Sequence, residues 1–406
     1  MMHSSTGRCG LASLRLLSFP VAICCFAVVF APVADAFKEI RIPAAADDKL
    51  GGIIPVVAPH AKVMLFHDDL GFLLVGEREP KKDGTLALYR VDGRGWPSAD
   101  PVLLPLPKPP GVSISYAVGL AFHPKLRQLY VWQDTDMVPP PGDEALYKAF
   151  EHLLIYDLSK PGPELIYRGC QGPQYQIGTY LAGLTIDSKC ARLYLPNMRD
   201  KDAAMIGYVA LDDKGLPLPE AKDKDKDKGD RARVENVAAV SGWPSGTSFC
   251  PISDDVVLFG GSYGPITWDL KDRRNRISSF YLYPYANYRF HMTVHPTMPV
   301  FFCLVSGQQY IYRFQHAHGY MTLMPHRYLI DDLIITSQPV LMPLQNQLVV
   351  AGTNKVLFLK LDAKGNILEK RGQSAIETIT EPPVIACSER WNSVFVPVPK
   401  RDKEKK

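Results

Sequence analysis

The residues best suited to chemistry are seven side chains that precede or open short apolar runs along the whole chain. They are Tyr116, Tyr180, Trp243, Arg289, His291, Gln338 and Glu381. They offer aromatic rings, a guanidinium, an imidazole and a carboxylate, which are groups that bind a polar ligand or transfer a proton. Because they lie far apart in the sequence, they form one site only if a repeated fold brings the runs together. An alternative role for the aromatic residues is to cap a channel, since their rings are large apolar bodies with a polar tip.

The chain does repeat one pattern, which consists of a short apolar run, a polar turn and a second apolar run. The pattern is clear in GLAFHPKLRQLYV at 119–131 and in HMTVHPTMPVFFC at 291–303. Five further copies lie at 63–75, 183–195, 247–259, 339–351 and 384–396. Short apolar runs bounded by turn residues predict strands that are buried on both faces. Each of the seven copies is therefore a predicted β-hairpin.

Six of the hairpins are followed by a third alternating strand and a Gly-rich or charged turn, as in LALYRVDGRG at 86–95. A unit of four antiparallel strands that recurs after about 45 residues is typical of a β-propeller blade, and longer spacings indicate loop insertions. The seventh hairpin leaves too little chain for outer strands. The segment FKEIRI at 37–42 alternates like a strand, so we expect it to pair with the last blade and close the ring. The sequence predicts an all-β, seven-bladed propeller as one domain over 37–399.

The copies HPKLRQLYV and HPTMPVFF resemble the YVTN-type, lactonase-like propellers of exported bacterial proteins, and the resemblance covers the chain after residue 36. A WD40 propeller fits less well, because Trp268-Asp269 is the only such dipeptide. The resemblance implies the fold. It leaves the function open, because the resembled proteins include lactone hydrolases, cell-surface modules and proteins without known activity.

The predicted topology places the second-to-third and fourth-to-first strand connections on one face, here called the upper face, where ligands of propellers usually enter. The seven residues above would ring its axis, and Asn197 and Arg199 would lie on its rim. The insertion at 133–152 also belongs there, and its EALYKAF stretch predicts a short helix with Asp143 as N-cap. It is interpreted as a solvated insertion or as a lid.

Two functions are compatible with such a face. The first is a binding module for a protein, a glycan or a small molecule. The second is a lactone hydrolase in which His291 or Glu381 is the general base and Arg289 stabilises an oxyanion. The chain contains no Gly-x-Ser-x-Gly, phosphate-loop or HExxH motif, which favours the binding module.

The N-terminal residues 1–36 predict an export signal. Arg8 and Arg15 precede an apolar core, and Ala34-Asp35-Ala36 offers small residues for cleavage. The core is short for a membrane span of about 20 residues, so we expect a periplasmic or extracellular protein without a stable span after cleavage; an uncleaved anchor is the alternative. The 46 basic and 42 acidic residues nearly balance, which gives no reason to expect nucleic acid. The basic tail at 400–406 is interpreted as a solvated end.

No metal or cofactor is predicted, and we expect a monomer. The five cysteines after residue 36 are scattered and odd in number, which favours buried thiols over a zinc site, with a single disulfide as the alternative. His316 and His318 share a strand face but lack a nearby carboxylate, whereas His123 and His295 are interpreted as turn residues. The charged run at 221–232 does not fit a calcium loop, because Lys228 occupies the position that requires glycine.

Overall fold

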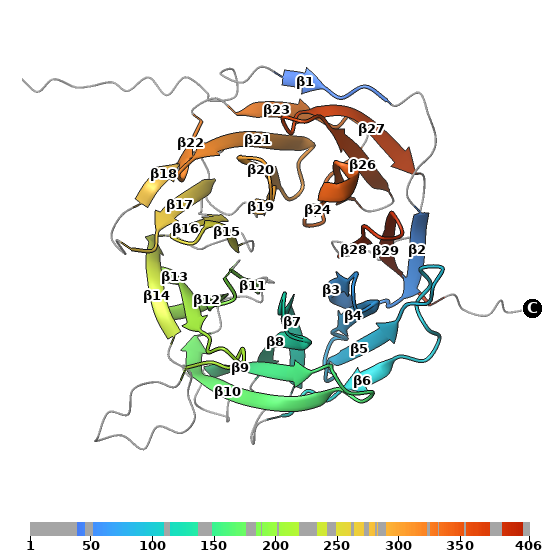
Figure 1. The fold of residues 1–406 in the computed structure, drawn as a ribbon, viewed down its shortest axis with the longest axis vertical. Coiled ribbons are helices and arrows are strands. Elements are labelled where there is room, and N and C mark those ends of the chain that lie inside the picture. Colours follow the sequence, from blue (N-terminus) through green and yellow to red (C-terminus); the bar gives the residue numbers. More distant parts are fainter. Residues whose placement is uncertain are drawn as a thin grey trace, which may run out of the picture.

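Seven β-sheets stand around a central axis in the computed structural model (Figure 1). The structure describes residues 39–44, 52–108, 114–136, 148–175, 184–187, 189–200, 203–218, 234–241, 249–260, 264–271, 276–280, 282, 290–322, 325–331, 333–352, 355–373 and 384–400. Among these residues there is no α-helix, and the one helical turn is a 3-10 turn, η2 (Pro343–Gln345). The all-β, seven-bladed propeller predicted from the repeats is confirmed.

All seven predicted hairpins are present, each made of the innermost and the second strand of a blade. The innermost strands are β3 (Ala61–His67), β7 (Ile114–Phe122), β11 (Thr185–Ile186), β15 (Phe249–Ser253), β19 (Phe290–Val294), β24 (Val340–Met342) and β28 (Ala386–Ser388). The second strands are β4 (Phe72–Glu77), β8 (Gln128–Asp136), β12 (Arg192–Asp200), β16 (Val256–Gly260), β20 (Val300–Val305), β25 (Gln347–Ala351) and β29 (Ser393–Val398).

The first six blades continue outward with two further antiparallel strands. The third strands are β5 (Thr85–Arg90), β9 (Lys148–Asp157), β13 (Ala203–Ala210), β17 (Pro265–Asp269), β21 (Tyr310–Ala317) and β26 (Val356–Leu361). The outer strands are β6 (Val102–Leu104), β10 (Glu164–Tyr175), β14 (Val234–Ser241), β18 (Arg276–Ser279), β23 (His326–Leu329) and β27 (Ile367–Gln373). A short strand, β22 (Tyr320–Met321), also pairs with β21. Strand β9 begins at Lys148, so the last part of the helix predicted over 144–150 is strand instead.

The prediction that residues 37–42 pair with the last blade is wrong. Strand β1 (Glu39–Arg41) lies parallel to β23, the outer strand of the fifth blade. The strand that joins the last blade is β2 (Gly52–Val57), which pairs with β29 in parallel, so this blade has three strands and is not wholly antiparallel. The segment around Pro55 does not alternate, and its proline disfavours a central strand. It is accommodated because β2 is an edge strand, where an N–H group is not required.

Residues 39–44 and 52–57, here called the N-terminal belt, therefore run along the outside of the fifth, sixth and seventh blades (Figure 1). Arg327 in β23 forms an ion pair with Glu39 at 3.1 Å. Ile42 is only 5% exposed and packs into the core between the fifth and sixth blades. The amide of Lys370 in β27 donates a hydrogen bond to the carbonyl of Pro43 at 2.9 Å. These contacts attach the belt to two neighbouring blades before it reaches the last one.

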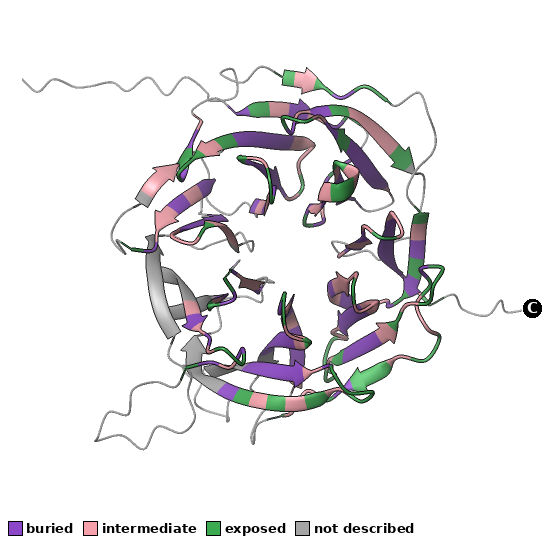
Figure 2. Cartoon of the chain, in the orientation of Figure 1, coloured by how far each residue is buried: buried purple, intermediate pink, exposed green. Residues whose placement is uncertain are grey.

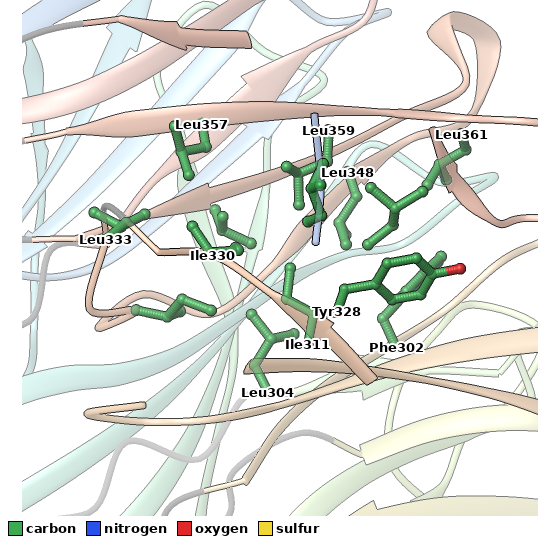
Figure 3. Packing of buried hydrophobic residues seen from close by; sticks show 14 of the residues in the cluster. Phe302, Leu304, Ile311, Tyr328, Ile330, Leu333, Leu348, Leu357, Leu359 and Leu361 are labelled. Atoms are coloured by element: carbon green, nitrogen blue, oxygen red, sulfur yellow. The ribbon is translucent and has the colours of Figure 1, made fainter. Parts of the chain in front are cut away.

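Apolar side chains fill the spaces between neighbouring blades. All six residues of β20 are buried, which explains why its sequence is a continuous apolar run rather than an alternating one. Figure 3 shows Phe302, Leu304 and Ile311 of the fifth blade against Leu348 and Leu357 of the sixth. Exposed residues are concentrated at turns and outer strands (Figure 2). One blade cannot cover its own faces, so stacking in a ring is what buries them.

The lower face, opposite the upper one, is built from repeated turns. Asp92, Asp212 and Asp362 each follow a third strand, and each carboxylate accepts hydrogen bonds from two backbone N–H groups of its own turn. Gly95 and its counterparts in the other two turns have φ of 88°, 73° and 73°, a region in which residues with a Cβ are strained. The Asp-x-x-Gly spacing thus sets the connection between third and fourth strands.

Side chains also connect each of several blades to a lower turn of the next. Each donates a hydrogen bond to a backbone carbonyl of the neighbouring blade, so the connection does not depend on the neighbour's side-chain type. The pairs are Arg90 with Pro161, Tyr130 with Gly215, Arg192 with Asp254, Thr267 with Gly319, and Arg313 with Gly365.

Cys190, Cys250, Cys303 and Cys387, the cysteines whose side chains the structure describes, are free thiols. Burial raises the pKa of the Cys250 thiol to about 12. A thiol that stays protonated is a poor nucleophile and metal ligand, so these cysteines serve packing, as the sequence indicated. In the described part of the chain, no helix is long and apolar enough to cross a membrane.

Candidate functional site

The upper face is the end at which innermost strands begin and second strands end. Several of the predicted site residues, namely Tyr180, Trp243, Arg289 and Glu381, lie outside the described residues. Asn197 and Arg199 lie in β12, whose backbone alone is described at these positions. The structure therefore places Tyr116, His291 and Gln338.

Tyr116 lies near the start of β7 and is 1% exposed. The guanidinium carbon of Arg78 stands 3.8 Å from the centroid of its ring, at a cation–π distance. On another side, Gly84 approaches so closely that a Cβ there would come within 2.5 Å of the Cβ of Tyr116. The ring is thus fixed between the first and second blades, with a cation on it.

His291 is the second residue of β19, is half-buried and pairs with Leu304. Gln338 precedes β24 and is exposed. These two residues belong to the fifth and sixth blades, across the axis from β7 (Figure 1). Each lies at or near the start of its innermost strand, as the sequence predicted. That all seven residues surround one pocket stays a prediction.

Lys62 is a residue at the upper face that the sequence reasoning missed. It lies at a β-bulge, because the pairing of β3 with β4 shifts between Ala61, opposite Glu77, and Val63, opposite Gly76. A bulge leaves one residue without a partner in the ladder and can redirect its side chain, and bulges are frequent beside functional sites. When the hairpins are aligned by their turns, Val63 occupies the position of His291. The extra residue before Val63 has no position in that alignment, so Lys62 was not selected.

Arg78 directly follows β4, and its backbone N–H donates a hydrogen bond to the carbonyl of His60 at 2.9 Å. Both Lys62 and Arg78 are half-buried. Burial lowers the pKa of Lys62, and the positive charge of Arg78 lowers it further. We call Lys62, Arg78 and Tyr116 the basic cluster. It combines two cations with an aromatic ring at the junction of two blades.

The loop after β4 holds the basic cluster against β7. The Asp83 carboxylate accepts a hydrogen bond from the backbone N–H of Ser115 at 3.0 Å, and it also pairs with Lys108 at 3.0 Å. The N–H of Gly84 donates to the carbonyl of Ser115 at 2.7 Å. These bonds fix the residue that precedes Tyr116. The position of the Tyr116 ring beneath Arg78 is therefore determined by backbone contacts between the first and second blades.

The histidines of the lower face have structural roles where the structure describes their contacts. The Nδ1 atom of His123 accepts hydrogen bonds from the backbone N–H groups of Lys125 and Leu126, and the Nδ1 atom of His295 lies in the same position in the fifth blade. The interpretation of both as turn residues is confirmed. Burial lowers the pKa of His316, which lies near the lower end of β21. No metal-binding group of His, Cys, Asp and Glu occurs among the described residues. The run at 221–232 lies outside them.

No family model matches the sequence, and no curated protein matches it. Solved structures do resemble the fold. The β-propeller domain of Cps50 (Swd1) from Myceliophteria thermophila is 11% identical, with a TM-score of 0.50 over 82% of this chain and 92% of that one. The periplasmic gluconolactonase of Pseudomonas aeruginosa is 14% identical, with a TM-score of 0.49 over 81% of this chain and 96% of that one. A putative 6-phosphogluconolactonase from Bacteroides fragilis is also 14% identical, with a TM-score of 0.48 over 80% and 86% of the two chains.

At such low identity the likeness concerns the fold alone. The strand order defines the chain as a seven-bladed β-propeller. Its function has to be argued from its own residues.

Proposed function

We propose that the protein is an exported propeller that binds a polar ligand at its upper face. The observation that carries the proposal is the basic cluster, in which Arg78 lies over the ring of Tyr116 between the first and second blades and Lys62 lies at the bulge of β3. Export is supported by the signal-like residues 1–36. The ligand classes that fit a propeller face are a protein, a glycan or a small molecule, and the proposal treats the protein as a monomer.

The upper face is favoured because polar groups on the lower face are used to build turns. The carboxylates of Asp92, Asp212 and Asp362 accept backbone hydrogen bonds, as does the ring of His123. In contrast, Lys62 is an extra bulge residue that no turn requires. Side chains held on packed strands are preorganised, and preorganisation reduces the entropy lost on binding.

Hydrogen exchange tests the site. Small polar compounds, glycans and proteins from an exported fraction are first screened for those that raise the melting temperature of the purified protein. Amide exchange is then compared with and without each hit. We expect protection at the upper end of β7 and at residues 77–84, and no change in the lower turn at 123–127. Protection confined to lower turns would contradict the proposal.

A lactone hydrolase is the second candidate. Half-buried His291 lies at the upper start of β19, where a general base could act, and two of the similar structures are described as lactonases. Glu381 is the alternative base, and Arg289 would stabilise the oxyanion. A panel of lactones is assayed with the wild type and with His291→Ala. Hydrolysis that the substitution abolishes supports this candidate, whereas equal rates for both proteins exclude His291 as the base.

A further inference from the structure

We propose that the outer edge of β23 accepts residues 39–44 of a second copy of this chain, so that two copies exchange these N-terminal segments. The inference goes beyond the proposed function, because it concerns the outer wall of the fifth and sixth blades and not the upper face. It is drawn from a strand, β1, that pairs in a defined register with a blade that is complete without it.

The fifth blade does not need β1. Its strands β19, β20, β21 and β23 already form the four-stranded antiparallel unit that the other complete blades have. β1 adds a further strand at the outer edge, and it runs parallel to β23 (Figure 1). The seventh blade differs, because β2 supplies its third strand. Departure of β1 therefore leaves a complete blade with an open edge, whose backbone N–H and C=O groups can pair with a strand from another chain.

The contacts of the segment define which strand fits this edge. Glu39 lies opposite Arg327 in the parallel ladder, and their side chains form an ion pair at 3.1 Å. Ile40 and Ile42 are two residues apart, so they share one face of the extended segment, and both pack against the core between the fifth and sixth blades. The edge thus selects a carboxylate that is followed, one and three residues later, by branched apolar side chains. Residues 39–44 of any copy of this chain meet these requirements.

The segment is small enough to leave its place while the blade stays folded. Its contacts come from six consecutive residues and include a ladder of three residue pairs, the side chain of Ile42, and a hydrogen bond from the N–H of Lys370 to the carbonyl of Pro43. Edge segments with so few contacts open locally far more often than a whole blade unfolds. Residues 45–51 connect the segment to β2, and seven residues span up to about 25 Å, which is enough to reach an adjacent copy.

The connection also decides which copy occupies the edge. A link of seven residues keeps the segment of the same chain at an effective concentration on the order of 1 mM. Below that protein concentration each wild-type copy therefore occupies its own edge and is a monomer. Exchange is favoured once pairing within a chain is weakened and pairing between two chains is intact.

A charge-swapped pair of full-length variants tests the inference by analytical ultracentrifugation. Glu39→Arg places two cations opposite each other within one chain, and Arg327→Glu places two carboxylates opposite each other. In a mixture, each segment meets an edge of opposite charge on the other chain. We expect a heterodimer at concentrations about a hundredfold below those at which wild type self-associates, because two mismatches of about tenfold each are relieved. Each variant alone should remain a monomer.

The matched control is the double variant Glu39→Arg with Arg327→Glu, which restores opposite charges within one chain. It should be a monomer alone, and mixing it with wild type should give no heterodimer. A mixture of the two single variants that is still monomeric at about 0.1 mM, tenfold below the effective concentration of the connected segment, would overturn the inference. So would a heterodimer that forms equally well with the double variant, because the association would then not depend on this ion pair.

The urea midpoint of each variant shows whether it folds. If Arg327→Glu does not fold, a fluorescent peptide of residues 37–44 is added to full-length Glu39→Arg and to wild type, and its anisotropy is measured. The peptide should bind the variant at least about tenfold more tightly, because the wild-type edge is occupied by its own segment. Ile42→Asp in the peptide should abolish binding, since a charge would enter the core between the blades. Equal binding to wild type and variant, or binding to neither, would overturn the inference.

Discussion

Replacement of Arg313 by methionine should destabilise the propeller more than any comparable change in a surface connection. Arg313 lies in β21 of the fifth blade and is 3% exposed. Its Nε atom donates a hydrogen bond to the carbonyl of Gly365 at 2.9 Å, and its Nη2 atom donates to the carbonyl of Lys364. Both acceptors belong to the lower turn of the sixth blade, so one side chain links two blades.

The magnitude follows from two opposing effects. A hydrogen bond that involves a charged group contributes about 1.5–3 kcal/mol, and two are lost in Arg313→Met. Part of this loss is offset, because burial of the cation is itself unfavourable, as the lowered pKa of Arg313 indicates. We therefore expect a net loss of about 2–4 kcal/mol in the free energy of unfolding. Arg313→Lys keeps the charge but not the fork, so its loss should be intermediate.

Urea unfolding followed by intrinsic fluorescence measures the effect. The matched control is Arg90→Met, which removes a bond of the same kind, from Nη2 to the carbonyl of Pro161 at 3.2 Å, in an exposed place. We expect this control to lose about 0.5 kcal/mol or less, as is usual for surface substitutions. Equal losses for Arg313→Met and Arg90→Met, or a gain in stability for Arg313→Met, would refute the reasoning that burial makes the interblade bonds strong.

Three further predictions concern other parts of the chain. Deletion of 221–230 should change the melting temperature and ligand binding little, because shortening a loop alters its closure entropy by under about 1 kcal/mol. The double substitution Tyr180→Ala with Arg289→Ala should weaken ligand binding. Loss of binding in the deletion variant alone would contradict both expectations. His123→Asn should flatten the fall in urea midpoint between about pH 7 and pH 5. Burial lowers the pKa of His123 in the folded protein below its unfolded value of 6.5. The contribution of the neutral ring to the free energy of unfolding is therefore fully present above that pH and is lost as the pH falls below it. An unchanged pH profile in His123→Asn would contradict this reasoning. Ile42→Ala should cost about 2–4 kcal/mol and speed amide exchange in β1, and unchanged exchange would show that the belt is attached otherwise.

The hairpin repeats could be predicted because each is a local pattern. The turn between two apolar runs specifies its own geometry, as in the Nδ1 bonds of His123 and His295. In the third blade, the Asp187 carboxylate accepts hydrogen bonds from backbone N–H groups later in the same turn. Local hydrogen bonds of this kind leave a signal in the residue types. The number of blades follows from counting that signal, without knowledge of any long-range contact.

The course of the N-terminal belt could not be predicted in the same way. Alternation predicted that 37–42 joins the last blade, and nothing in the pattern pointed to 52–57. In the structure, residues 52–57 pair in parallel with β29 of the last blade. Residues 39–44 stay at the fifth and sixth blades, because Ile42 packs into the core between them. Which edge a strand joins depends on packing between distant residues, and a pattern within one segment carries no information about it.

The candidate site itself stays a prediction, but the positions of some of its residues can be compared with the sequence. Tyr116 and His291 lie near the starts of innermost strands, as the repeats predicted. Lys62 was overlooked because a bulge changes the register by one residue without changing the apolar pattern. Arg78 was overlooked because its role depends on a ring in the next blade, which no spacing rule within the first blade can show.

The parallel pairing of Gly52–Val57 with Ser393–Val398 has a consequence for the order of folding. During synthesis β2 emerges before the other six blades and its partner β29 emerges after them, so the seventh blade cannot be completed until those six have been made. Contacts between residues so distant in sequence form slowly. Meanwhile the apolar residues Val394, Phe395 and Val396, buried in the finished protein, form an open strand edge, and such edges pair with other chains. Aggregation therefore competes chiefly with this last step, and the yield of native protein depends on how fast two distant strands meet rather than on how fast any single blade forms.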